Sequence, residues 1–161
     1  MKKGILVTSF GTSHKDTREK SIEVIENMVK ERYGSENVER AFTSDIIRKI
    51  IEKKEGFHVY NQKEGLEVLK NKGYNEIITM STHILEGNEY SKLTNEYGKI
   101  TNPLLYDDND YNTIVNNPEF NNLEGNDALV LMGHGSESNA DKCYDILQEK
   151  NIYVKKLDFD I

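Results

Sequence analysis

Short apolar runs alternate with longer amphipathic segments along most of the chain. The apolar runs are bounded by glycine or polar residues, which is typical of buried parallel strands. The amphipathic segments carry aliphatic residues at helical spacing, which predicts helices with one apolar face. The predicted strands are residues 4–10, 38–42, 76–80, 100–105, 128–132 and 152–159. The predicted helices are residues 16–33, 45–55, 61–71, 89–97 and 140–149.

This alternation predicts the α/β class, with a parallel sheet and helices on both of its faces. Two segments fit the pattern less well. Pro103 interrupts the strand predicted at 100–105. Residues 107–117 are rich in Asp and Asn and are predicted to form a loop that leads into a short helix. The apolar face expected for helix 45–55 comprises Ile46, Ile47, Ile50 and Ile51.

Composition narrows the function classes. The chain has 161 residues and a formal net charge of −7, which argues against a nucleic-acid or anionic-membrane binder. Its single cysteine, Cys143, cannot form an intrachain disulfide, which fits a cytoplasmic protein. No stretch approaches the ~20 apolar residues of a membrane span. Residues 1–13 lack the extended apolar region of a signal peptide, so we expect a strand there.

Polar residues follow the predicted strands where each strand ends. Ser9–Ser13, Thr43-Ser44 and Ser81-Thr82-His83 are such segments, and so is the glycine-flanked His134. Three of the four histidines (His14, His83 and His134) fall at these ends. Because ligands bind beyond the carboxyl ends of parallel strands, we expect a site at this edge of the sheet. Turn formation and helix capping are the alternative roles for these small polar residues.

Several familiar sites are missing from the sequence. No G-x-G-x-x-G, P-loop, C-x-x-C or H-E-x-x-H pattern occurs, and GHGSES at 133–138 does not match the hydrolase motif G-x-S-x-G. One cysteine is too few for an ordinary closed zinc site. What remains is an imidazole, His134, between Gly133 and Gly135, with carboxylates elsewhere at the same edge. Imidazole and carboxylate ligands suit an open site for cobalt, nickel, iron or zinc.

Five motifs, in order and with roughly matching spacing, resemble the anaerobic cobalt chelatases, the sirohydrochlorin cobaltochelatase family of class II chelatases. They are SFGTS at 9–13, AFTSDIIRK at 41–49, HILEGNEY at 83–90, PLL at 103–105 and MGHG at 132–135. The resemblance implies two similar α/β lobes with a tetrapyrrole between them. It also implies ATP-independent insertion of Co²⁺ into sirohydrochlorin for cobalamin biosynthesis, with Ni²⁺ or Fe²⁺ as alternative metals and no cofactor beyond the metal substrate.

The resemblance assigns roles to individual residues. His134 matches the histidine that binds metal and accepts protons, and Glu89 matches the acidic residue beside the metal path. Both are therefore predicted catalytic and metal-binding residues. The predicted substrate-binding residues lie in the first loop, the HILEGNEY motif and the MGHG motif. They are Ser9, Phe10, Gly11, Thr12, Ser13, His83, Gly87, Gly133 and Gly135.

One departure from the family affects these expectations. The family has a second histidine ligand far down its C-terminal lobe, and this sequence has no counterpart. We therefore expect an N-terminal chelatase lobe at 1–124 and an incomplete second lobe, strand–helix–strand, at 125–161. The chain is either a truncated relative or a subunit completed by a second copy. The alternative functions are a non-catalytic or decayed tetrapyrrole- or metal-binding lobe, and an unrelated α/β domain with structural histidines.

Overall fold

The computed structural model describes residues 3–95, 98–118, 130–133, 135, 139–150 and 153–156. The chain divides into two compact units. The first unit comprises Met1–His83 and Glu89–Asn102, and the second comprises Ile84–Asn88 and Pro103–Ile161. The predicted lobe boundary at residue 124 lies within 119–129, outside the described residues, and stays a prediction.

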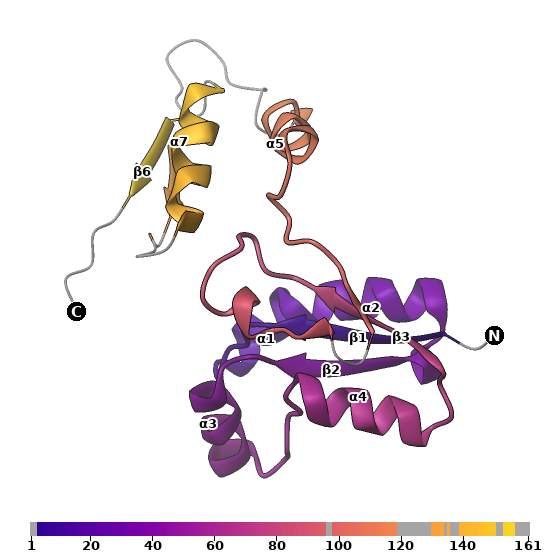
Figure 1. Cartoon of the computed structure of the whole chain (residues 1–161). Coiled ribbons are helices and arrows are strands. Elements are labelled where there is room, and N and C mark those ends of the chain that lie inside the picture. Colours follow the sequence, from indigo (N-terminus) through magenta and orange to yellow (C-terminus); the bar gives the residue numbers. More distant parts are fainter. Residues whose placement is uncertain are drawn as a thin grey trace. The chain divides into compact units, whose positions relative to one another are not determined.

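Figure 1 shows the course of the chain and labels its main helices and strands. The first unit contains β1 (Lys3–Ser9), α1 (Lys15–Lys20), α2 (Ile22–Tyr33), η1 (Ser35–Asn37), β2 (Val38–Phe42), α3 (Asp45–Glu55), α4 (Gln62–Asn71), β3 (Glu76–Ser81), η2 (Tyr90–Lys92) and β4 (Lys99–Ile100). The second unit contains α5 (Asp108–Val115), β5 (Val130–Gly133), η4 (Asn139–Asp141), α7 (Lys142–Glu149) and β6 (Tyr153–Lys156).

The first unit is built on a parallel sheet with strand order β2-β1-β3-β4. In this register Ser9 lies opposite Phe42, and Thr8 lies opposite Ser81. The carboxyl ends of β1, β2 and β3 therefore meet at one edge. The chain passes from β1 to β2 on one side and returns to β3 on the other, so the strand order reverses between β1 and β3. Such a reversal is where α/β sheets bind ligands.

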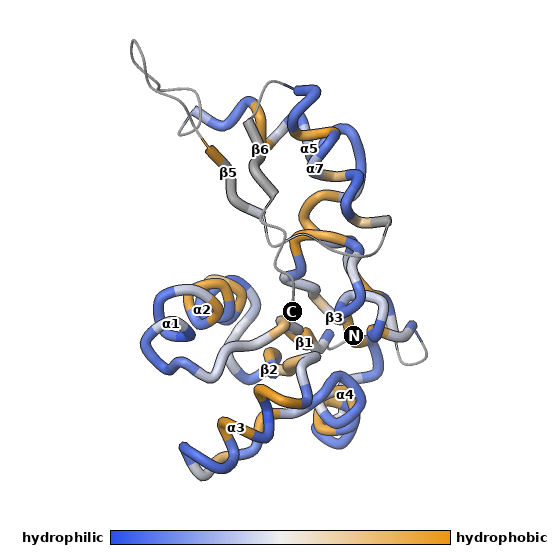
Figure 2. The backbone as a smooth tube through the Cα atoms, turned by 90° about the vertical axis from the view of Figure 1, so that its left-hand side faces the viewer, coloured by the Kyte–Doolittle hydropathy of each residue, from blue (hydrophilic) through white to orange (hydrophobic). Residues whose placement is uncertain are grey.

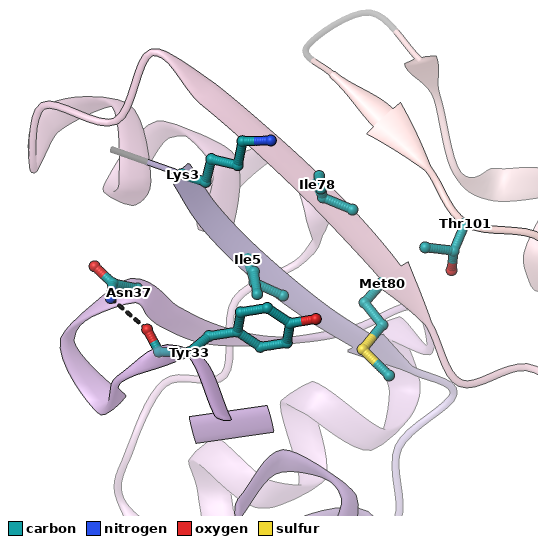
Figure 3. A pocket seen from close by; sticks show the side chains of 7 residues that line it. All are labelled: Lys3, Ile5, Tyr33, Asn37, Ile78, Met80 and Thr101. Carbon is teal, nitrogen blue, oxygen red and sulfur yellow. Dashed lines mark hydrogen bonds between the residues drawn. The ribbon is translucent and has the colours of Figure 1, made fainter. Parts of the chain in front are cut away.

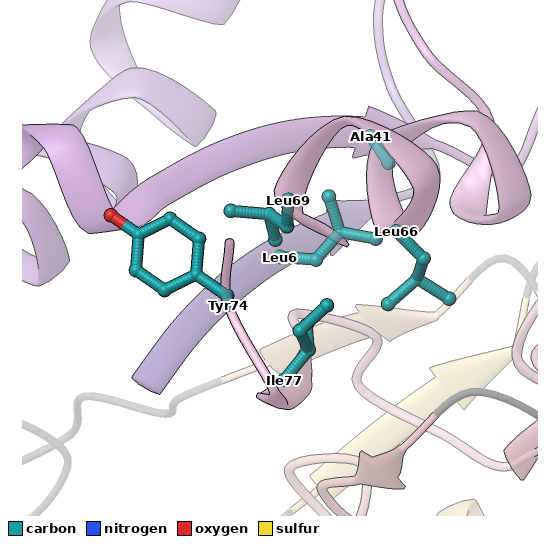
Figure 4. Packing of buried hydrophobic residues seen from close by; sticks show 6 residues of the cluster. All are labelled: Leu6, Ala41, Leu66, Leu69, Tyr74 and Ile77. Carbon is teal, nitrogen blue, oxygen red and sulfur yellow. The ribbon is translucent and has the colours of Figure 1, made fainter. Parts of the chain in front are cut away.

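Helices cover both faces of this sheet, as the alternating pattern predicts (Figure 2). On one face Val29 of α2 packs against Ile5 and Val7 of β1. On the other face the α4 leucines Leu66 and Leu69 pack against a cluster that includes Leu6 (Figure 4). Successive residues of β1 point to opposite faces, so a continuous apolar run is needed for a strand buried on both sides.

Gly65 allows α4 to approach β1 closely. A Cβ atom at this position would lie 2.5 Å from Cδ1 of Leu6, which is fully buried. Glycine within a helix costs about 1 kcal/mol relative to alanine. In return, the absence of a side chain at Gly65 allows α4 to pack directly on β1, the strand that precedes the first polar loop.

The predicted helix 16–33 is interrupted, and this part of the prediction is wrong. Ser21 separates α1 from α2, with φ −130° and ψ −79°. Its hydroxyl donates to the carbonyl of Thr17 at 2.7 Å. A serine hydroxyl competes in this way with the helical backbone and bends or breaks the helix.

The predicted helix 89–97 is also wrong over its described part. The described part contains the short turn η2 and a 3-10 residue at Asn95 in place of an α-helix, and the side chain of Gln62 binds the main chain of Thr94 between them. Gln62 Nε2 donates to the Thr94 carbonyl at 3.1 Å, and Gln62 Oε1 accepts from the Thr94 N–H at 2.9 Å. These contacts take the polar groups of Thr94 away from helical partners.

Two further predictions need correction. The Asp- and Asn-rich segment is mainly the helix α5, because Asp107 and Asp110 form a capping box that starts it at once. The strand predicted at 100–105 is reduced to β4, and beyond it the Leu105 N–H donates to the carbonyl of Ile84 at 2.9 Å. Ile46 is 72% exposed, so it lies off the buried face of α3, where Ile51 is fully buried.

The second unit repeats the strand–helix–strand pattern in its described part. β5 and β6 pair in parallel, with Val130 opposite Tyr153. A separate apolar cluster includes Leu105, Tyr111, Cys143 and Leu147.

None of the helices among the described residues has the length and apolar character of a membrane-spanning helix.

Candidate functional site

The carboxyl edge of the sheet carries a hydrogen-bonded group of small polar side chains with one histidine. We call Ser9, Thr43, Ser81, Thr82 and His83 the polar edge. The Thr43 N–H donates to the Ser9 carbonyl at 2.9 Å, and Thr82 Oγ1 donates to Ser9 Oγ at 2.8 Å. Because the three strands are parallel and in register, these residues meet despite their separation along the chain.

His83 has a hydroxyl at each ring nitrogen. Its Nδ1 lies 2.9 Å from Ser81 Oγ, and its Nε2 lies 3.4 Å from Thr43 Oγ1. A hydroxyl can either donate or accept, so both nitrogens of a neutral imidazole can be satisfied. The ring of Tyr90 lies edge-on, with centroids 6.1 Å apart.

Burial sets the charge of this imidazole. Desolvation lowers the pKa of His83 below its ordinary value near 6.5, and the carboxylate of Glu89 opposes this by favouring the charged form. Burial is the larger of the two effects. His83 is therefore neutral at physiological pH and can accept or donate one hydrogen bond at each nitrogen.

Glu89 has one oxygen paired and one left over. Its Oε1 lies 2.5 Å from Nζ of Lys92, and its side chain is 27% exposed. Its Oε2 is buried and has no hydrogen-bond partner within the part of the chain that the structure describes. Buried polar atoms are almost always partnered, so an unused carboxylate oxygen marks a place where a ligand N–H or a cation can bind.

The loop after β1 is held close to the sheet. Gly11 has φ +98°, and a Cβ there would lie 2.6 Å from the ring of Phe42. The Thr12 hydroxyl accepts from the His14 N–H at 3.2 Å. Phe10 leaves about half of its side chain exposed beside this turn. The predicted loop residues therefore combine hydroxyls with one apolar side chain at the carboxyl edge.

The remaining predicted residues belong to the second unit. Gly87 lies there in open surroundings, with nothing within 4 Å of the position that a Cβ would take. A Cβ at Gly133 would overlap the ring of Tyr144, and Gly135 has φ +79°. Only glycine suits both positions. His134 lies outside the described residues, so its metal-binding role stays a prediction.

Metal binding at Glu89 is likewise not tested by the geometry. Among the described residues, no three His, Cys, Asp or Glu side chains gather closely enough to hold a metal ion. Of the two predicted metal ligands, only Glu89 lies among the described residues, and its metal-binding role stays a prediction.

Thr43 and Ser81 belong to the strand-end segments at which the sequence predicts a site, but they are not among the residues to which the family resemblance assigns a role. Each ends or follows a strand whose carboxyl end meets that of β1. Their contacts to the two nitrogens of His83 give them a positioning role that residue type alone does not indicate.

The first unit also has a cavity of about 420 Å³ on the α2 face of the sheet (Figure 3). Its lining is mainly apolar and includes none of the polar edge. It is lined by Lys3, Ile5, Tyr33, Asn37, Ile78, Met80 and Thr101. The predicted site and this cavity are therefore separate features.

Comparison with known proteins agrees with the sequence motifs. Residues 3–156 match the family described as cobalt chelatase (CbiK), and the chain belongs to that family. It is also 32% identical, over 155 residues, to the sirohydrochlorin cobaltochelatase of Salmonella typhimurium. The match covers 89% of this chain and 59% of the relative, so the chain spans less than two thirds of that protein. The family indicated by the five sequence motifs is confirmed.

Proposed function

We propose that this chain inserts Co²⁺ into sirohydrochlorin, the activity that the name of its Salmonella relative states for that protein. The observation that carries the proposal is the unpartnered, buried Oε2 of Glu89 beside a neutral His83, in a chain of the cobalt chelatase family. Carboxylate oxygen and imidazole nitrogen are ligands that cobalt accepts.

The reaction needs a metal path and a base. Sirohydrochlorin gives up two pyrrole N–H protons as the metal binds its four nitrogens, so two protons must reach a base and then water. His134 is our candidate base, because an ordinary imidazole pKa near 6.5 allows it to take and release protons near neutrality. Glu89 is our candidate for holding the partly desolvated cation beside the macrocycle.

The substrate's carboxylates also need partners. The hydroxyls and N–H groups of Ser9–Ser13 lie at the carboxyl edge, and Phe10 offers an exposed ring beside them. We propose that this loop receives the side-chain carboxylates of the tetrapyrrole while Phe10 contacts an apolar part. Positioning of the substrate in this way, together with proton acceptance by a base, would accelerate metal insertion over the spontaneous reaction.

In this proposal the protein needs no cofactor beyond the metal substrate, and Ni²⁺ and Fe²⁺ are the competing metals. We also propose a cytoplasmic location. Completion of the site by a second copy of the chain or by a further lobe stays a prediction. The molar mass in solution, measured with and without sirohydrochlorin, tests completion by a second copy: a dimer supports it, and a monomer that still inserts cobalt contradicts it.

The test of the function is an anaerobic absorbance experiment with sirohydrochlorin and CoCl2. We expect conversion to the metallated spectrum at a rate that is proportional to protein concentration and above the spontaneous rate. Binding of sirohydrochlorin without a metallated product would contradict the proposal and indicate a binding protein instead. No spectral change at all would contradict both functions.

A further inference from the structure

Arg18 is a buried cation next to the predicted substrate loop. It lies in α1 and is only 2% exposed. Its guanidinium makes a two-point contact with Glu55, Nη1 to Oε1 at 3.1 Å and Nη2 to Oε2 at 2.6 Å. Nη1 also donates to the main-chain carbonyl of Thr12 at 3.3 Å. The planar fork of five N–H donors allows one arginine to make these contacts together.

Another carboxylate lies on the remaining side of the guanidinium, although Nε has no hydrogen-bond partner among the described residues. Nε of Arg18 lies 3.5 Å from Glu23 Oε1, which is in turn 2.9 Å from Nη2 of Arg40. Arg40 also pairs with the fully buried Glu26. The result is a chain of alternating charges that joins α3, α1, α2 and β2. Arg18 is its member closest to the loop, and its position is therefore fixed by three secondary-structure elements.

This contact sets the direction of one peptide group. In a planar trans peptide the carbonyl and the next N–H point in opposite directions. The Thr12 carbonyl points at Arg18, so the N–H of Ser13 points away from the buried guanidinium. Within the described part of the chain, no acceptor takes a hydrogen bond from that N–H. The Thr12 hydroxyl accepts from the His14 N–H, which orders this turn, and its own O–H can still donate to a ligand.

We propose that Arg18 is the positioning residue of the loop Gly11–His14, and that it presents the Ser13 N–H to a carboxylate of the substrate. This rests on the proposed function, because the loop is the predicted site for the carboxylates of sirohydrochlorin. Arg18 does not touch the ligand. Arg18 acts through the Thr12–Ser13 peptide group, and Glu55 holds the guanidinium in place.

Arg18→Lys is the informative change. Lysine keeps the charge, but its ammonium is a compact donor that does not span both Glu55 oxygens and the Thr12 carbonyl. We expect the dissociation constant for sirohydrochlorin to rise about tenfold, the loss of one hydrogen bond involving a charged group, with little change in the rate at saturating substrate.

Arg40→Lys is the matched control. It removes a two-point contact from the same chain of charges, but Arg40 contacts Glu23 and Glu26 and not the loop. Both variants should lower the thermal midpoint. Only Arg18→Lys should speed amide hydrogen exchange in the loop Gly11–His14 and weaken sirohydrochlorin binding.

The experiment measures both quantities on the full chain. If Arg18→Lys leaves loop exchange and binding at the values of the unmodified chain, or if Arg40→Lys changes them equally, the inference is wrong. If Arg18→Lys does not fold, Glu55→Gln tests the same contact, and unchanged exchange and binding would overturn the inference. If the unmodified chain does not bind sirohydrochlorin, the proposed function fails, whereas the loop exchange of the variants still decides the role of Arg18.

Discussion

Thr82 Oγ1 donates a hydrogen bond to Ser9 Oγ at 2.8 Å, joining the ends of β3 and β1 across 73 positions of sequence. The contact lies where the strand order of the sheet reverses. A ligand that binds there meets the loops after both strands at once. The polar edge is therefore a product of sheet topology, and its members depend on one another.

The Ser9–Thr82 contact can be measured by a double-mutant cycle. Thr82→Val removes the donor while keeping the shape, and Ser9→Ala removes the acceptor. We expect each change to lower the free energy of unfolding, and the double variant to lose less than the sum. The coupling should be about 1 kcal/mol, as for an ordinary buried hydrogen bond. Fully additive losses in urea unfolding would show that the two hydroxyls do not interact.

His83 should make stability depend on pH. Burial lowers its folded-state pKa below the unfolded value near 6.5, so the unfolded chain takes up the proton first as pH falls. This contribution to stability is complete above the unfolded pKa and is lost as pH falls from about 6.5 toward the folded pKa. His83→Gln should flatten that part of the profile in urea unfolding.

His14→Gln is the control for loss of an imidazole, since His14 is exposed on the loop. The effect expected of His83→Gln is the change in slope beyond any seen with His14→Gln, across about the range in which histidines titrate. A profile unchanged by His83→Gln would mean that His83 is protonated equally in the folded and unfolded states.

Glu89→Gln should separate cobalt use from folding. The change removes the charge that we propose holds the cation, so the cobalt concentration for half-maximal insertion should rise at least about tenfold, the loss of a charge-assisted interaction. Stability should change little, because the ion pair with Lys92 is solvent-exposed on the lysine side. Glu86→Gln, an exposed neighbour, is the matched control. Equal cobalt dependence in both variants would remove Glu89 from the metal path.

Gly11→Ala should destabilise the first unit more than Gly56→Ala does. Both glycines have positive φ, +98° and +73°, which costs a side-chain-bearing residue about 1–2 kcal/mol. Only Gly11 faces a neighbour, the ring of Phe42, whereas nothing lies within 4 Å of a Cβ at Gly56. Overpacking should therefore add about 1–3 kcal/mol at Gly11. Equal midpoints in urea would contradict the close approach of the loop to Phe42.

Local patterns predicted the sheet and most of its helices. The apolar run around Leu6 and the helical spacing of aliphatic residues in 45–55 are signals that act within a few residues, and the structure has a strand and a helix at these places. The polar edge followed from the same reasoning, since residues after parallel strands must share an edge.

Some of the failures originate in contacts between residues that are distant in sequence, whereas the break at Ser21 and the capping box of α5 are local. The side chain of Gln62 binds the main-chain groups of Thr94, which is 32 positions further along the chain, and so prevents the predicted helix there. No local sequence pattern indicates this contact. The contact of Arg18 with Glu55, 37 positions apart, is equally invisible to periodicity, because a charged residue on a helix normally indicates solvent. Such contacts are specified by the assembled fold.

The most direct measurement is the rate of Co²⁺ insertion into sirohydrochlorin by the unmodified chain and by His134→Ala. We predict insertion well above the spontaneous rate for the unmodified chain, and a fall of about 100-fold or more when the proposed base is removed. Equal rates for the two proteins would exclude His134 from the mechanism. An unmodified chain that binds the tetrapyrrole and never metallates it would contradict the proposed function itself.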